Sequence, residues 1–128
     1  MKSIANEQIF AFDIDGTLIG LKRHEVPYEE EYNGHSLTVE QPYTKQLLKV
    51  FANQGHIDLL KQMHGRGRFI IVWSAGGVRW AENVLKALKL EDYAHLIMTK
   101  PLGYVDDVRC DQWMSHHIFL GPVEEDKV

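Results

Sequence analysis

The stretch IFAFDIDGTLIG, which begins at Ile9, constrains the possible folds of this chain more than any other feature. Its first four residues are apolar, a run typical of a strand buried on both faces. Asp13 follows directly, and Asp15 comes two residues later, before Gly16 and Thr17. A carboxylate at the end of a buried strand is costly unless it is paired or coordinates a metal. We therefore expect a buried strand that ends in a polar site.

Apolar patterning along the rest of the chain predicts strands that alternate with helices. Two further strands are expected at Arg68–Ser74 and His95–Thr99, with shorter candidates at Gly103–Asp107 and His117–Gly121. Apolar residues at helical spacing predict helices over residues 43–51, 55–67 and 76–90. This alternation favours an α/β fold with a parallel sheet.

Length, composition and charge indicate how many domains the chain forms, which partners it binds and in which compartment it occurs. The chain has 128 residues and is 45% hydrophobic, which suits a single domain over residues 1–128. The formal net charge is −4, and a chain with an excess of negative charge is not expected to bind nucleic acid nonspecifically. Cys110 is the single cysteine, which excludes an internal disulfide and argues against a cysteine-based metal site. No apolar run has the length of a membrane span, and we expect a cytoplasmic protein with no membrane partner.

The segment after the first strand has a different character. Asn33-Gly34 separates two stretches that can extend, and Asn-Gly is typical of a tight hairpin. A hairpin at this point would rise from the carboxyl edge of the sheet, where ligands bind in α/β folds. We expect Tyr28–Thr38 to form a lid within an insertion at about residues 20–54. Alternatively it is a solvated loop, and substrate choice comes from Gln41–Gln54 or from a partner subunit.

Polar side chains come at or just after the ends of the predicted strands. Because these ends meet at one edge of a parallel sheet, the side chains should converge there. The set is Asp13, Asp15, Ser74, Lys100, Asp106 and Asp107. Clustered carboxylates repel one another, and oxygen ligands without histidine or cysteine favour Mg²⁺. A lysine beside such a metal, and glycines that expose backbone N–H groups at a helix start, are suited to phosphate.

Four motifs in order, DIDGTL, VWSAGG, TKP and YVDD, resemble those of the haloacid dehalogenase superfamily of phosphohydrolases. They span Ile9 to Asp107, and the chain is also similar to small phosphatases of this superfamily often encoded by bacteriophages. The resemblance implies a Rossmann-like three-layer sandwich with a mainly parallel sheet and a small flap hairpin or minimal cap. It also implies Mg²⁺-dependent hydrolysis of a phosphate monoester through an aspartyl-phosphate. A nucleotide or a nucleic-acid phosphate is one candidate substrate, and a sugar phosphate or a phosphoprotein is another.

The resemblance assigns roles to individual residues. Asp13 would be the nucleophile and Asp15 the general acid and base, and Ser74 and Lys100 would complete the catalytic set. Phosphate binding is implied for residues after three strands, namely Gly16, Thr17, Ser74, Ala75, Gly76 and Lys100. Mg²⁺ would be held by Asp13, the backbone carbonyl of Asp15, Asp106 and Asp107, with the direct ligand of the last pair left open.

Two alternatives remain open at this point. A fold of this type can be kept as a binding module for a phosphorylated ligand or a protein, with turnover lost. A small lid also leaves room for a large substrate or for a second subunit, so a homo-oligomer is compatible with the sequence. Trp73 and Trp80 are interpreted as packing residues rather than as stacking surfaces for a substrate.

Overall fold

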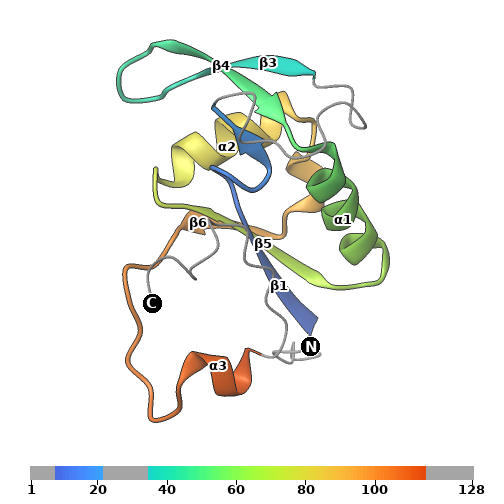
Figure 1. Ribbon diagram of the computed structural model, residues 1–128, viewed down its shortest axis with the longest axis vertical. Helices are drawn as coiled ribbons and strands as arrows, with labels where there is room; N and C mark the ends of the chain where they lie inside the picture. Colours follow the sequence, from blue (N-terminus) through green and yellow to red (C-terminus); the bar gives the residue numbers. More distant parts are fainter. Residues whose placement is uncertain (1–7, 22–34, 115–128) are drawn as a thin grey trace, which may run out of the picture.

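Three parallel strands form one sheet in the computed structural model, which describes residues 8–21 and 35–114 (Figure 1). The order in the sheet is β1 (Ile9–Asp13), β5 (Phe69–Ser74) and β6 (Leu96–Thr99). Asp13 lies opposite Trp73, and Ser74 lies opposite Thr99. All three strands therefore end at the same edge. The predicted parallel sheet of an α/β fold is confirmed for these strands.

Two helices pack on one face of this sheet. They are α1 (Gln54–Gly65) and α2 (Val78–Ala87), and the short turn η3 (Glu91–Tyr93) follows them. Their apolar side chains meet the fully buried Ile70 and Val72 of β5. Both helices were predicted from the spacing of their apolar residues, and both are confirmed.

The opposite face of the parallel sheet has a different environment. Ile9 and Leu96 lie on it and are 36% and 44% exposed. A sandwich with helices on both faces would cover them, but residues 8–21 and 35–114 contain no helical layer on this side (Figure 1). Among the described residues α2 instead lies between two sheets (Figure 1). The coarser expectation of an α/β fold holds, while the three-layer arrangement is not seen in this part of the chain.

The second sheet is antiparallel, with the order β2 (Ile19–Gly20), β4 (Leu47–Ala52) and β3 (Ser36–Glu40). The predicted helix over residues 43–51 is therefore wrong. In β4 the inward positions recur at every second residue, from Leu48 to Val50 to Ala52, which is the period of a strand. Pairing with β3 overrides the helical spacing that includes Tyr43 and Leu47.

The antiparallel sheet lies over α2, on the side away from the parallel sheet (Figure 1). Its inward residues Val39, Val50 and Ala52 join the same core as the two helices. This sheet falls within the predicted insertion at residues 20–54. The expected turn at Asn33-Gly34 lies outside the described residues, as does most of the proposed lid. The strand β3 does extend at the predicted place, and it pairs with β4.

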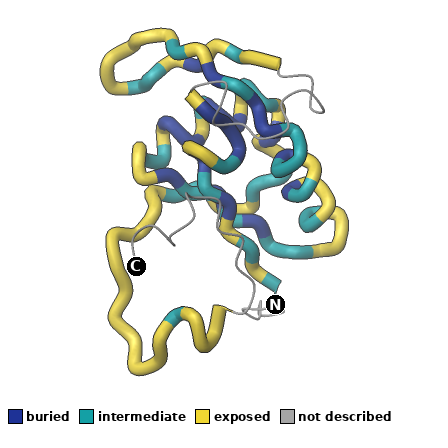
Figure 2. The backbone as a smooth tube through the Cα atoms, viewed as in Figure 1, coloured by how far each residue is buried: buried dark blue, intermediate teal, exposed yellow. Residues whose placement is uncertain are grey.

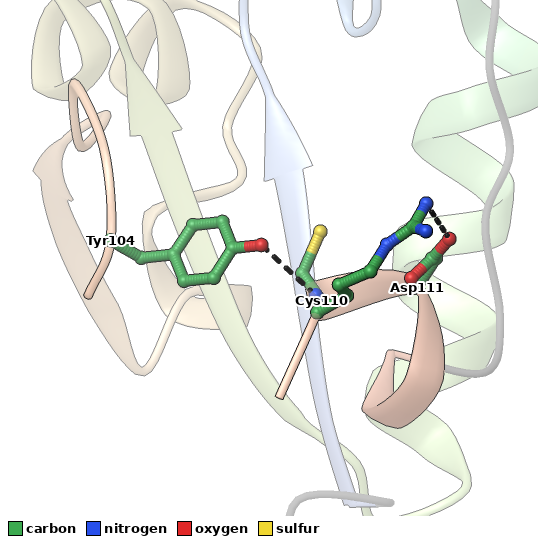
Figure 3. A network of polar contacts seen from close by, with 4 residues as sticks. Tyr104, Cys110 and Asp111 are labelled. Atoms are coloured by element: carbon green, nitrogen blue, oxygen red, sulfur yellow. Dashed lines mark hydrogen bonds and ion pairs between the residues drawn. The ribbon is translucent and has the colours of Figure 1, made fainter. Parts of the chain in front are cut away.

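After Lys100 the chain leaves the sheet as an exposed arm, here residues 101–114 (Figure 2). The predicted strand at Gly103–Asp107 is wrong, because these residues are exposed and pair with no strand in the described part of the chain. The short helix α3 (Cys110–Trp113) ends the arm. Local contacts hold it: the backbone N–H of Cys110 donates to the Tyr104 hydroxyl at 3.1 Å (Figure 3). The predicted strand at His117–Gly121 lies outside the described residues.

Candidate functional site

A tight turn after β1 sets the positions of the two acids. Ile14, between Asp13 and Asp15, is fully buried, and so is Leu18. The carbonyl oxygen of Ile14 accepts hydrogen bonds from three following backbone N–H groups at 3.0–3.2 Å. Gly16 has a φ of 79°, a left-handed conformation that disfavours residues with a Cβ atom. The acids therefore lie on a turn that the core anchors on both sides.

The carboxylate of Asp15 is held by hydrogen bonds at both oxygens. The indole Nε1–H of Trp80 donates to Oδ1 at 3.0 Å, and the Ser74 hydroxyl donates to Oδ2 at 3.4 Å. Ser74 is fully buried, and its Oγ also accepts the backbone N–H of Gly76 at 3.0 Å. Trp80 is only 5% exposed, so its packing holds the indole in place. The ends of β1 and β5 and the first turn of α2 together orient this one side chain.

Asp13 lies between opposing electrostatic influences. Burial raises the pKa of Asp13, while the positive charge of nearby Lys100 lowers it and the charge of Asp15 raises it further. Lys100 is anchored at this edge because its backbone N–H donates to the carbonyl oxygen of Ser74 at 2.9 Å. The structure thus brings together four of the predicted residues at the carboxyl edge of the sheet: Asp13, Asp15, Ser74 and Lys100.

The loop that leads from β5 into α2 lies at the same edge, and the backbone N–H groups of Gly76 and Gly77 donate to Ser74. Ala75 and Gly76 are exposed, and the helix is capped by Gly77 with a φ of 103°. The first turn of α2 contains no acidic residue, so the positive end of the helix dipole is not neutralised from within the helix. A Cβ atom on Gly77 would lie 2.9 Å from the hydroxyl of Tyr43, so this glycine also permits a close approach by the turn between β3 and β4.

The start of α1 supports the turn from the other side, through residues that the sequence interpretation missed. The Nδ1 atom of His56 lies 2.7 Å from the carbonyl oxygen of Thr17, a hydrogen bond when that nitrogen carries the proton. The backbone N–H of Asn53 donates to the carbonyl oxygen of Leu18 at 2.9 Å. Asparagine before a helix is a recognisable capping signal. The contact of His56 with Thr17 spans 39 residues, and no local pattern predicts it.

A pocket of about 200 Å³ opens beside Asp15. It lies between the acid, α2 and the antiparallel sheet, and its lining is Asp15, Leu21, Gln41, Leu48, Gly76 and Trp80. The sequence predictions included Asp15 and Gly76 but assigned no site role to the other four. Gln41 and Leu48 belong to the segment Gln41–Gln54, the alternative source of substrate choice. The apolar spacing over residues 43–51 predicts a helix, and a helix would not place Leu48 beside Gln41 in this pocket.

Asp106 and Asp107 lie on the exposed arm. The Asp107 side chain lowers the pKa of Asp106 by hydrogen bonding, and the backbone N–H of Val108, 3.1 Å from Oδ1 of Asp106, lowers it further. Within residues 8–21 and 35–114, no group of three or more His, Cys, Asp or Glu residues is arranged to hold a metal ion. Asp13 and Asp15 lie together at the end of β1, whereas Asp106 and Asp107 lie on the exposed arm, so the Mg²⁺ site expected from the sequence stays a prediction.

Comparison of the chain with protein-family models, with curated proteins and with solved structures found no match. The site is therefore interpreted from its own residues. No helix in the described part of the chain combines the length and the apolar character that a bilayer span requires.

Proposed function

We propose that the protein is a phosphohydrolase of the haloacid dehalogenase type, which hydrolyses a phosphate monoester through an aspartyl-phosphate. One observation carries the proposal. Two acids lie two residues apart on an anchored turn at the end of β1, with a lysine beside the first and two hydrogen-bond donors on the second. A nucleophile, a proton donor and a cation for the phosphoryl group are the parts that this reaction needs.

In the first step an Oδ atom of Asp13 attacks phosphorus, and the bond from phosphorus to the leaving oxygen breaks. Asp15 gives its proton to that oxygen, so an alcohol leaves. In the second step Asp15 takes a proton from water, and the oxygen of that water attacks phosphorus. Inorganic phosphate departs and the Asp13 carboxylate is restored. Lys100 offsets the negative charge on Asp13 and the phosphoryl oxygens in both steps.

The contacts on Asp15 suit a residue that must both give and take a proton. An indole N–H is a donor only, so the Trp80 bond keeps Oδ1 as an acceptor. The proton on Asp15 would then sit on Oδ2. The Ser74 hydroxyl beside Oδ2 can donate to an ionised carboxylate or accept from a protonated one. Direct contact of Ser74 with the phosphoryl group, expected from the sequence, stays a prediction, because its hydroxyl points at Asp15.

Mg²⁺ remains part of the proposal as a cofactor. Asp13, Asp106 and Asp107 carry the oxygen ligands that Mg²⁺ prefers, and phosphoryl transfer generally needs a cation at the phosphate. The arm acids lie apart from Asp13 among the described residues. We therefore assign them no geometry at the metal and no step in the reaction.

A binding module for a phosphorylated ligand is the second candidate. The observation that favours it is the separation of the arm acids from the end of β1, which leaves Lys100 beside Asp13 as a cation for an anionic ligand without an assembled metal site. The two candidates differ in turnover. Only the first predicts release of inorganic phosphate.

A substrate panel tests the proposal. Purified protein is incubated with a chromogenic phosphate ester and with phosphorylated metabolites, nucleotides and oligonucleotide ends, in Mg²⁺ and in EDTA. We expect phosphate release in Mg²⁺, its loss in EDTA and its recovery when Mg²⁺ is restored. Binding of phosphorylated ligands without turnover of any of them would favour the binding module. Full activity after exhaustive chelation would remove Mg²⁺ from the proposal.

A further inference from the structure

We propose that the pocket beside Asp15 receives the leaving group of the substrate and selects a compact, mainly apolar group with the size of a single ring. This inference rests on the proposed function and deepens it by naming the substrate class. It is carried by the position, the lining and the volume of the pocket.

The position of the pocket follows from the role of Asp15. A general acid must come within hydrogen-bond reach of the oxygen that it protonates. Asp15 itself lines the pocket, and so does Gly76, at the start of the loop that leads into α2. A leaving oxygen in contact with Asp15 therefore directs the group attached to it into this space. The phosphoryl group would remain outside, toward Asp13 and Lys100.

The walls of the pocket are mainly apolar. Leu48 comes from the inner face of β4, Leu21 follows β2, and the Trp80 ring comes from the first turn of α2. The polar atoms are few and partly occupied. The Trp80 N–H donates to Asp15, and Oε1 of Gln41 accepts the backbone N–H groups of Tyr43 at 2.6 Å and Thr44 at 3.0 Å. This leaves the amide NH₂ group of Gln41 as the side-chain donor that can still meet a ligand.

A polyhydroxylated leaving group is poorly matched to such a lining. Each sugar hydroxyl placed against the two leucines and the indole would lose its water without gaining a partner, which is unfavourable. An aromatic ring would instead exchange water for apolar contact and could pack against Trp80. The lining thus favours esters of compact apolar alcohols over sugar phosphates.

The pocket is open toward solvent, and its volume matches a single ring. A dry cavity of about 150 Å³ lined by apolar side chains is enough for benzene. At about 200 Å³ the pocket holds one such ring. It is smaller than the roughly 300–1,000 Å³ of sites for drug-sized ligands. A nucleoside, with both a base and a sugar, would extend beyond it.

The test compares two esters whose leaving alcohols have similar acidity, benzyl phosphate and glycerol phosphate. We expect kcat/KM to be at least about 10-fold higher for benzyl phosphate, in line with the discrimination available to an apolar pocket. Leu48→Asn should reduce this preference severalfold, mainly through KM for benzyl phosphate. Leu47→Asn is the matched control, because Leu47 is the neighbouring residue on β4 and is 66% exposed on the outer face. It should leave the preference intact.

Leu21→Asn repeats the test at a wall residue that is already 48% exposed, in case the change at Leu48 prevents folding. Equal kcat/KM for the two esters, or a preference that survives in both wall variants, would overturn the inference while the phosphatase proposal stands. Hydrolysis of neither ester, and of no member of the wider panel, would overturn the proposed function and the inference with it.

Discussion

The two pairs of acids in this chain are held in place in different ways. Asp13 and Asp15 lie on a turn held by the fully buried Ile14, and the carboxylate of Asp15 accepts hydrogen bonds from two other elements. Asp106 and Asp107 lie on the exposed arm, where Asp106 accepts a hydrogen bond from the backbone N–H of Val108, two residues away. The first pair is positioned by the core, and the second by its own sequence neighbours.

The two ways of holding an acid suit different functions. Orientation by packing is what a reacting group requires, because a misplaced side chain loses most of its effect. An acid held only by local contacts can still bind a cation, but its position is not determined by the fold. We therefore expect substitutions at the end of β1 to affect chemistry, and substitutions on the arm to affect metal dependence.

The largest effect is expected for Asp13→Asn. This change removes the attacking charge, and we predict a loss of phosphatase activity of at least roughly 1,000-fold, as for a core catalytic group. The measurement is kcat/KM on the best ester of the panel. Asp111→Asn is the control on the arm, where Asp111 pairs with Arg109 at 3.0 Å on an exposed surface. If both variants keep the activity of the wild type, the distinction between the two regions fails.

The paired change Asp106→Asn and Asp107→Asn tests the arm. We predict that the Mg²⁺ concentration for half-maximal activity rises about 10-fold or more, because each substitution removes an anionic oxygen ligand. The melting temperature in EDTA should stay nearly constant, since both residues are exposed. The change in half-maximal Mg²⁺ concentration is measured by titrating activity against Mg²⁺. An unchanged titration curve would show that the arm acids are not ligands.

A smaller effect is expected for Trp80→Phe. The phenyl ring keeps most of the packing but removes the N–H that holds Oδ1 of Asp15. Loss of one hydrogen bond to a charged group is worth about 1.5–3 kcal/mol, so kcat should fall by about 10- to 150-fold. Trp73→Phe on β5 is the matched control. Equal losses in the two variants would indicate general loosening of the fold rather than orientation of Asp15.

The smallest effect concerns stability in EDTA. Because burial raises the pKa of Asp13 above its ordinary 3.8, the folded protein keeps that proton to a higher pH than the unfolded chain. The contribution of this proton to the free energy of unfolding is present at low pH and is lost as the pH rises through the folded pKa of Asp13. At neutral pH, Asp13→Asn should therefore melt higher than the wild type, by roughly 1–3 °C.

Melting curves between pH 4 and 8 check this prediction. The gap between variant and wild type should shrink as the pH falls through the folded pKa of Asp13, because the folded protein then carries no charge on this buried side chain. A variant that melts lower than the wild type at every pH would contradict the cost assigned to the buried carboxylate.

Local patterns predicted much of the fold. The three parallel strands are short apolar runs, and the helices α1 and α2 have apolar residues at helical spacing. The structure has all five elements within a few residues of the expected ends. Residues 43–51 were misread because Tyr43, Leu47 and Phe51 fit a helical face, while the pairing that makes β4 a strand comes from β3. The strand expected at Gly103–Asp107 failed for a related reason, since in the described residues it pairs with no other strand.

In the candidate site, too, local sequence patterns predicted the residues at strand ends but not the contacts between distant residues. Asp13, Asp15, Ser74 and Lys100 could be predicted because each one ends a strand or follows one directly, and parallel strands share an edge. The bond from Trp80 to Asp15 joins residues 65 positions apart, and only the packing of α2 creates it. The pocket requires the antiparallel sheet, so Leu48 and Gln41 could not be recognised before that sheet was known.

The central claim is that Asp13 forms a covalent bond to phosphorus, and chemical trapping tests it most directly. The protein is quenched in acid during turnover, and the acyl phosphate is reduced with borohydride, which converts the modified aspartate to homoserine. We predict homoserine at position 13, none at Asp15 or on the arm, and none in Asp13→Asn. Steady turnover with an unmodified Asp13, or with the phosphoryl group on another residue, would contradict the claim.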